Sequence, residues 1–171
     1  MHWVEAAVAA KVSLVQIREK ALSARVLFAL AERAAAITRG SETRLLVNDR
    51  FDVARAAGAD GVHLTSQSLP ADVVRSLCGE EFLIGVSAHS LQEVRTAAER
   101  GADFVVFGPV FETESKRIFG EPQGLEKLRE VTTALNDFPV IAIGGIDRSN
   151  MAECYRAGAS GIAAIRLFSF K

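Results

Sequence analysis

The chain has 171 residues, of which 49% are hydrophobic and 24% are charged, and its formal net charge is −1. This composition predicts a globular protein of one domain, and the near-neutral charge excludes a general electrostatic attraction to nucleic acid. The N-terminus has no secretory signal pattern and no apolar run approaches the roughly 20 residues of a membrane span, so we expect a cytoplasmic protein without a membrane partner.

Short apolar runs rich in β-formers alternate with longer amphipathic segments along the chain. A first helix is predicted near residues 4–10, followed by strands at 12–17, 44–47, 61–64, 82–86, 104–107, 139–143 and 161–165. The predicted helices between these strands cover residues 24–38, 52–57, 70–77, 91–100, 125–135 and 148–157. Most of the strands are apolar at consecutive positions, which is typical of parallel strands buried on both faces.

A short repeat marks the passage from helix to strand. The sequence A-G-A-D at 57–60 recurs as R-G-A-D at 100–103 and as A-G-A-S at 157–160. Glycine suits a left-handed helix C-cap, and we expect Asp60 and Asp103 to be turn residues. Repeated βα units favour a barrel over an open sheet. The prediction is an α/β fold, a (β/α)₈ TIM-type barrel without its first strand and its last helix, formed by residues 1–171 as one domain.

Polar side chains follow the first two predicted strands, at the carboxyl ends where such barrels carry their functional residues. Gln16, Arg18 and Lys20 alternate along an extended segment and therefore share one face. An amide with two cations suits an anionic substrate. After the second strand, Asp49 can hold Mg²⁺ through oxygen, and Asn48 can bind a heterocycle or a phosphate.

The next two strands end in histidine and serine residues. His63 lies in the third strand, and we favour a hydrogen-bonded barrel histidine over a catalytic base at this position. Ser87 and His89 follow the fourth strand. Two interpretations of His89 are left open: a residue of the site, or a cap of the next helix.

The fifth strand is followed by G-P-V-F-E-T-E-S-K at 108–116. The hydroxyls of Thr113 and Ser115 and the ammonium of Lys116, with backbone N–H groups beside them, suit a phosphate or diphosphate group. The alternative is an ordinary solvated loop. The rest of the chain favours the phosphate interpretation, because polar groups recur at so many of the strand ends.

The last two predicted strands end in further candidates for phosphate binding. Gly144 and Gly145 separate a buried strand from a helix, which is typical of a backbone-amide phosphate site, although a glycine pair also makes simple turns. Ile165 ends the seventh predicted strand, and Arg166, which follows it, can act as a second phosphate clamp. In eight-stranded barrels the loops after the last two strands commonly bind phosphate.

Six stretches, taken in this order, resemble the thiamine phosphate synthase family, which also contains a thiazole tautomerase branch. They are Q-I-R-E-K at 16–20, V-N-D-R at 47–50, G-A-D-G-V-H-L at 58–64, I-G-V-S-A-H at 84–89, G-P-V-F-E-T-E-S-K at 108–116 and A-I-G-G-I at 142–146. The similarity extends over residues 12–168. It implies a (β/α)₈ barrel that starts here after its first strand. It implies an enzyme of thiamine biosynthesis that joins a hydroxymethylpyrimidine diphosphate to a thiazole phosphate and releases Mg²⁺-bound diphosphate.

The resemblance also implies roles for single residues. The pyrimidine diphosphate would face Gln16, Arg18, Lys20, Asn48 and Ser87, and Asp49 would ligate Mg²⁺. The diphosphate and the thiazole phosphate would be held by Thr113, Ser115, Lys116, Gly144, Gly145, Ile165 and Arg166. The residues expected to act in catalysis are Arg18, Ser87 and Lys116.

Three positions depart from the family's pattern. Ser68 stands where the synthases have a second Mg²⁺-binding aspartate, Arg166 stands where a serine is usual, and Pro109 stands where the tautomerase branch has a histidine. Two alternative functions therefore stay open beside the synthase. One is a thiazole-phosphate isomerase or binding protein of the same family. The other is an inactive truncated barrel whose unpaired strand edges would favour a homo-oligomer.

Overall fold

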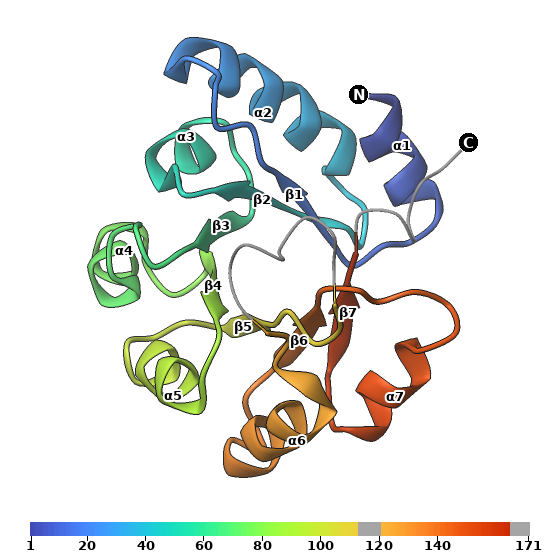
Figure 1. Cartoon of the computed structure of the whole chain (residues 1–171). Coiled ribbons are helices and arrows are strands. Elements are labelled where there is room, and N and C mark those ends of the chain that lie inside the picture. The colour runs from blue at the N-terminus through green and yellow to red at the C-terminus, as the bar shows by residue number, and fades with distance from the viewer. Residues whose placement is uncertain (113–120, 165–171) are drawn as a thin grey trace. The chain divides into compact units, whose positions relative to one another are not determined.

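The structure, a computed structural model, describes residues 1–112 and 121–164, in which parallel strands alternate with helices (Figure 1). This alternation confirms the predicted α/β class. By its internal contacts the chain divides into two compact units, one from Met1 to Ile84 and a second that begins at Gly85. The division falls within one strand, β4 (Leu83–Ala88).

Unit 1 carries the first strands and helices. In chain order they are α1 (His2–Ala9), β1 (Leu14–Ile17), α2 (Ala24–Thr38), β2 (Arg44–Asn48), α3 (Phe51–Ala56), β3 (Gly61–Leu64) and α4 (Ala71–Cys78). The strands β1, β2 and β3 pair in parallel in this order, with Val15 opposite Leu45 and Val47 opposite Val62. Every residue of β3 is buried, as the apolar run predicts.

The helix α2 covers the strands of unit 1 with small side chains. Its buried positions include Leu27, Ala31 and Ala34, and the two alanines are fully inaccessible to solvent. Because alanine adds so little bulk, the helix axis can lie close to the strands. The helix begins after Ser23, whose Oγ accepts a hydrogen bond from the Val26 N–H at 3.4 Å.

The first strand begins later than the sequence predicts, at Leu14 instead of residue 12. The N–H of Val12 donates to the carbonyl oxygen of Ala7 at 3.0 Å, and Lys11 has a φ of 53°. Residues 11 and 12 therefore still belong to the turn that ends α1. A local apolar pattern does not reveal such a turn.

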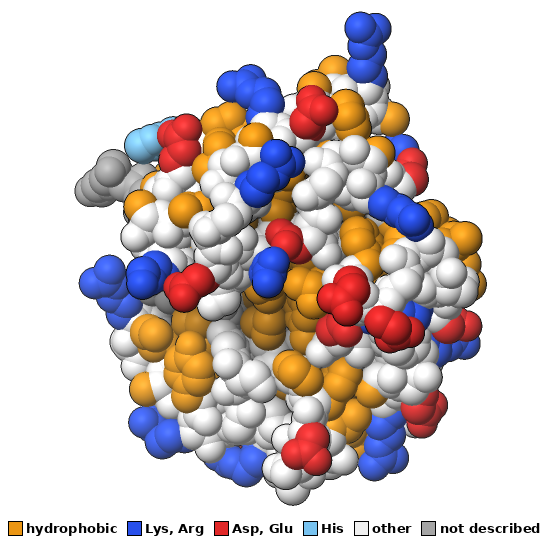
Figure 2. All heavy atoms as spheres, turned by 180° about the vertical axis from the view of Figure 1, so that it is seen from behind, with side chains coloured by type: hydrophobic (Ala, Val, Ile, Leu, Met, Phe, Trp, Pro, Cys, Tyr) orange, Lys and Arg blue, Asp and Glu red, His pale blue; other side chains and the backbone are white. Residues whose placement is uncertain are grey.

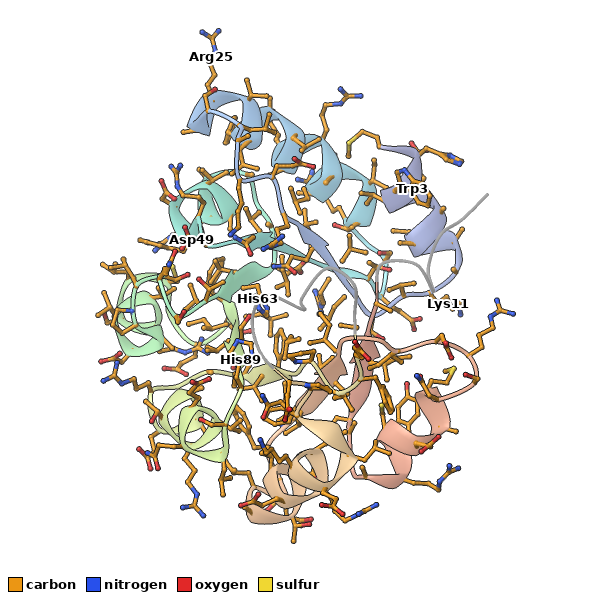
Figure 3. The ribbon with its side chains drawn as sticks, viewed as in Figure 1. Trp3, Lys11, Arg25, Asp49, His63 and His89 are labelled. Carbon is orange, nitrogen blue, oxygen red and sulfur yellow. The ribbon has the colours of Figure 1, made fainter. Side chains whose placement is uncertain are left out.

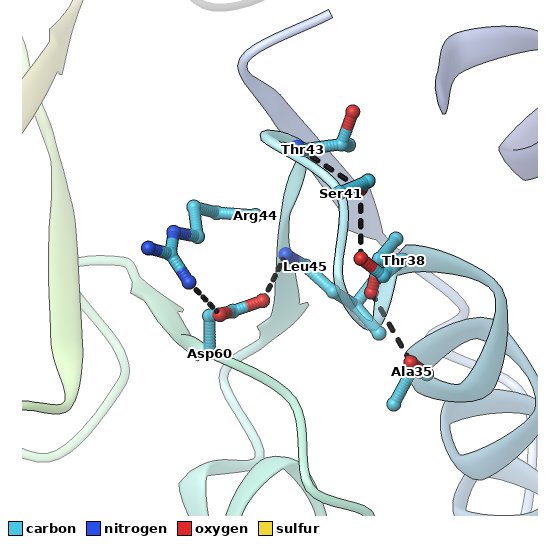
Figure 4. A network of polar contacts seen from close by, with 7 residues as sticks. All are labelled: Ala35, Thr38, Ser41, Thr43, Arg44, Leu45 and Asp60. Carbon is cyan, nitrogen blue, oxygen red and sulfur yellow. Dashed lines mark hydrogen bonds and ion pairs between the residues drawn. The ribbon is translucent and has the colours of Figure 1, made fainter. Parts of the chain in front are cut away.

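The amino ends of β2 and β3 are joined by the side chain of Asp60 (Figure 4). Its Oδ2 accepts from the N–H of Leu45 at 2.7 Å, and its Oδ1 accepts from Nη1 of Arg44 at 2.9 Å. Beside it, Ser41 Oγ donates to the carbonyl oxygen of Thr38 at 2.7 Å. The first copy of the repeat thus ends in a residue that fixes the fold, which confirms the prediction that Asp60 is a turn residue.

Unit 2 continues the same alternation with α5 (Leu91–Glu99), β5 (Phe104–Phe107), α6 (Gly124–Ala134), β6 (Val140–Ile143), α7 (Met151–Arg156) and β7 (Gly161–Ala163). Within it the strands pair in parallel from β4 to β7, with Val106 opposite both Ser87 and Ile141. The helix α7 begins later than the predicted residue 148, because the Ser149 N–H donates to Asp147 Oδ1 at 2.7 Å in a turn before it. The predicted end of the last strand, residue 165, lies outside the described residues.

Two surface properties bear on partners. On the face drawn in Figure 2, basic and acidic side chains are interspersed and neither sign forms a large patch of its own. Over residues 1–112 and 121–164, no helix combines the length and apolar character needed to cross a membrane.

Candidate active site

Two predicted site residues of unit 1 meet at the carboxyl ends of neighbouring strands. Gln16 lies on β1 and Asn48 ends β2, and Gln16 Nε2 donates a hydrogen bond to Asn48 Oδ1 at 3.2 Å. Within the described part of the chain, nothing accepts a hydrogen bond from the Asn48 amide nitrogen. As far as the described residues go, the two N–H donors of Asn48 are therefore available to a ligand. Arg18 and Lys20 follow β1, and both side chains are exposed.

Asp49 adopts an unusual backbone conformation just after β2. Its φ of 65° lies in the left-handed region, which a residue other than glycine rarely adopts. The conformation is held because the Asp49 N–H donates to the carbonyl oxygen of His63 at 2.8 Å and its own carbonyl accepts from Phe51 at 3.1 Å. The residue is exposed, and Figure 3 shows it where β2 passes into α3. Such strain is characteristic of functional positions.

His63 lies on β3 beside this turn and is only 6% exposed (Figure 3). Burial, and to a lesser extent the positive charge of Arg18, lowers the pKa of His63 to about 4. The imidazole is therefore neutral at pH 7. A group with so low a pKa is a weak general base, which supports the prediction that His63 is a structural histidine.

The arginine of the V-N-D-R stretch is already paired. Arg50 donates from Nε and Nη2 to the two carboxylate oxygens of Asp52, at 2.8 and 2.6 Å. This bidentate contact lowers the pKa of the Asp52 carboxyl. Arg50 is thus a less available anion ligand than Arg18 or Lys20.

The turn after β3 uses the hydroxyl of Ser68, the residue predicted to stand where the family has a second acidic ligand. Ser68 Oγ accepts from the N–H of Thr65 at 2.8 Å and lies 3.2 Å from Thr65 Oγ1. Nowhere in residues 1–112 and 121–164 do three or more His, Cys, Asp or Glu side chains gather as a metal site. Mg²⁺ is commonly bound by one or two carboxylates together with substrate phosphates. The exposed carboxylate of Asp49 is an oxygen donor of the kind that such an ion uses.

In unit 2 the loop that follows β5 is joined to the loop that follows β6. The N–H of Val110 donates to the carbonyl oxygen of Ile143 at 2.8 Å, and the N–H of Phe111 donates to that of Gly144 at 3.0 Å. The far end of the β5 loop returns to its start, since the Gln123 N–H donates to the carbonyl oxygen of Pro109 at 2.7 Å. In the sequence, Thr113, Ser115 and Lys116 lie between these two ends, outside the described residues. Ile165 and Arg166 also lie outside the described residues.

Gly144 and Gly145 are required by the shape of the loop after β6. Their φ values are 100° and 63°, and a Cβ on Gly145 would lie 2.6 Å from the carbonyl oxygen of Glu112. Among the described residues, none accepts a hydrogen bond from the N–H groups of Gly144, Gly145 or Ile146. Successive N–H groups left open in a glycine turn form a concave anion site. The loop geometry therefore suits a phosphate group.

His89 connects β4 with the start of the β5 loop. Its ring nitrogen Nδ1 hydrogen-bonds to the carbonyl oxygen of Gly108, so that nitrogen carries the proton. The cap of α5 comes instead from Ser90, whose Oγ accepts from the Glu93 N–H at 3.2 Å. Of the two interpretations left open for His89, the helix cap is wrong, because its ring bonds to the β5 loop. Ser87 lies half-buried on β4.

Comparison with known proteins gives consistent matches. A family model described as thiamine monophosphate synthase matches residues 1–168. The putative thiamine-phosphate synthase of Geobacter sulfurreducens is 48% identical over 162 residues, which are 95% of this chain and 76% of that protein. The thiamine-phosphate synthase of Roseiflexus castenholzii is 43% identical, again over 95% of this chain and 71% of that protein. Among solved structures, thiamine phosphate pyrophosphorylase from Pyrococcus furiosus is similar with a TM-score of 0.85 and 34% identity, over 96% of this chain and 78% of that one.

Proposed function

Because the chain belongs to the thiamine monophosphate synthase family, we propose that it joins a hydroxymethylpyrimidine diphosphate to a thiazole phosphate and so forms thiamine phosphate. The observation that carries this proposal is the family match over residues 1–168. The similarity to a solved thiamine phosphate pyrophosphorylase supports a (β/α) barrel as the architecture of a single domain. The isomerase and inactive-barrel alternatives are not favoured, since the relatives compared above are named as synthases.

The chemistry is the displacement of one group by another at a methylene carbon. The bond between the pyrimidine methylene and the diphosphate oxygen breaks, and its electron pair leaves with the diphosphate. The lone pair of the thiazole nitrogen forms the new bond to the methylene carbon. The protein's main task is therefore to bind both substrates and to stabilise the departing negative charge.

The residues of unit 1 are assigned to the pyrimidine diphosphate. Arg18 and Lys20 supply positive charge for the diphosphate oxygens, and Asn48, oriented by Gln16, supplies two N–H donors. Asp49 would hold Mg²⁺ against the diphosphate. When bound, the ion neutralises charge that develops on the leaving group. Because Ser68 stands in place of a carboxylate, Asp49 is the acidic residue that we assign to Mg²⁺.

The residues of unit 2 are assigned to both substrates. The open N–H groups of Gly144 and Gly145, with Ile165 and Arg166, would bind the phosphate of the thiazole. Ser87 would contact the pyrimidine. Thr113, Ser115 and Lys116 would bind diphosphate and the thiazole substrate, with Lys116 stabilising the leaving group. The cytoplasmic location and the self-association predicted from the sequence remain predictions.

The test is a condensation assay with each component omitted in turn. Thiamine phosphate should form only when both phosphorylated substrates and Mg²⁺ are present. Asp49→Asn should raise the Mg²⁺ concentration needed for half-maximal rate at least about tenfold. The matched control is Asp52→Asn, which removes a nearby exposed carboxylate that is paired with Arg50. Equal Mg²⁺ dependence in both variants would overturn the role of Asp49.

A further inference from the structure

In the loop after β6, the carbonyl oxygens of three consecutive peptide groups all accept hydrogen bonds. Backbone N–H groups hold the first two, as Val110 donates to Ile143 and Phe111 donates to Gly144. The third carbonyl, that of Gly145, is held by a side chain. Asn150 Nδ2 donates to it at 2.9 Å.

A held carbonyl fixes the direction of the N–H in the same peptide group. The peptide group is planar and trans, so its C=O and N–H point in opposite directions. When Asn150 binds the carbonyl oxygen of Gly145, it therefore sets the direction of the Ile146 N–H. Counting only hydrogen bonds to described residues, that N–H is the third open donor in this loop.

Asn150 is itself fixed at two points. Its Oδ1 accepts from the N–H of Asp147 at 2.9 Å while its Nδ2 donates to Gly145, so the side-chain amide spans Ile146. Asp147 is anchored in turn by Ser149, whose N–H and Oγ donate to Asp147 Oδ1 at 2.7 and 2.6 Å. These hydrogen bonds lower the pKa of the Asp147 carboxyl. The amide of Asn150 therefore has little freedom to rotate away from the loop.

We propose that Asn150 is a positioning residue for the phosphate monoester of the thiazole substrate: it aligns the Ile146 N–H with the phosphate and does not touch the phosphate itself. This inference rests on the proposed function for the identity of the substrate. It requires only that a phosphate monoester binds the open N–H groups at Gly144, Gly145 and Ile146. Sequence reasoning missed this residue, which follows G-G-I-D-R-S within the same loop.

The test is calorimetric titration of the full chain with two ligands, the thiazole phosphate and the same thiazole alcohol without its phosphate. Asn150→Ala should weaken binding of the thiazole phosphate about tenfold, as expected for a lost charge-assisted hydrogen bond. Binding of the alcohol should be unchanged. The matched control is Asn136→Ala, which removes an exposed side-chain amide outside this loop and should bind both ligands as the wild type does.

A purely structural role for Asn150 would weaken both ligands equally, and that result would overturn the proposal. Unchanged binding of the thiazole phosphate would overturn it as well. If Asn150→Ala does not fold, Asn150→Ser serves in its place, because it keeps an oxygen that can accept from Asp147, loses the amide donor to Gly145 and adds no negative charge near the phosphate. A wild-type chain that binds thiazole phosphate but forms no product would refute the proposed synthase activity and leave this inference standing.

Discussion

Mild acidification should destabilise the protein through the buried His63. Its pKa in the folded chain is lowered to about 4, first by burial and then by the charge of Arg18. In the unfolded chain a histidine titrates near 6.5. As the pH falls, the unfolded state therefore binds the proton first. The stability that neutral His63 provides is complete above about pH 6.5 and is lost progressively towards pH 4.

The size of the effect follows from these two values. The difference between 6.5 and about 4, at roughly 1.4 kcal/mol per pH unit, amounts to about 3 kcal/mol at and below pH 4. At pH 5 the loss is about 2 kcal/mol. This is a large share of the stability of an ordinary domain, about 5–15 kcal/mol.

The assay is urea unfolding of the wild type and of His63→Gln between pH 7.5 and pH 5. The wild type should lose about 2 kcal/mol more than His63→Gln over this range. His2→Gln is the matched control, because His2 is exposed at the N-terminus and its removal should leave the pH dependence unchanged. A His63→Gln variant with the wild-type pH dependence, or an NMR titration of His63 near pH 6.5, would refute the reasoning.

Three further changes test other parts of the account. Asp60→Ala should lower the free energy of unfolding by about 1–3 kcal/mol, because the N–H of the buried Leu45 loses its acceptor. An unchanged denaturation midpoint would contradict the role of Asp60. Gly145→Ala should weaken binding of thiazole phosphate at least about tenfold in calorimetry, because a Cβ would crowd Glu112 at a left-handed φ; wild-type affinity would show that the loop adapts. Ser68→Asp should raise Mg²⁺-dependent turnover, because a carboxylate binds Mg²⁺ better than a hydroxyl; a rate equal to wild type at every Mg²⁺ concentration would argue against a missing ligand.

The alternation of strands and helices could be predicted because it is written in local patterns. Consecutive apolar residues predict buried parallel strands, and the strand Gly61–Leu64 has the bounds expected from its apolar run. The glycine of each repeat adopts a positive φ after its helix, as at Gly58 with 71°. These features depend on neighbouring residues in the chain, so the sequence alone reveals them.

The sequence predicts that Gln16 and Asn48 lie near each other, but it does not predict the hydrogen bond between them. Each residue ends or nearly ends a strand, and parallel neighbours bring their carboxyl ends to the same edge. The hydrogen bond between the two side chains depends on register, because Gln16 lies opposite Leu46 and so within reach of Asn48. Register is not visible in a single sequence.

The parts that sequence reasoning missed arise from contacts between loops. Asn150 stands in a polar turn that resembles many others, and only the fold shows that its side chain holds the carbonyl of Gly145. His89 precedes a helix and therefore suggested a cap, although its ring bonds to Gly108, far along the chain. Such hydrogen bonds have no signature in spacing or composition.

The most direct test of the central claim is the detection of thiamine phosphate by mass spectrometry after the purified chain is incubated with both phosphorylated substrates and Mg²⁺. We expect thiamine phosphate and free diphosphate in equal amounts, and neither when the metal is chelated. A folded chain that binds both substrates and releases no diphosphate would contradict the assignment of synthase activity.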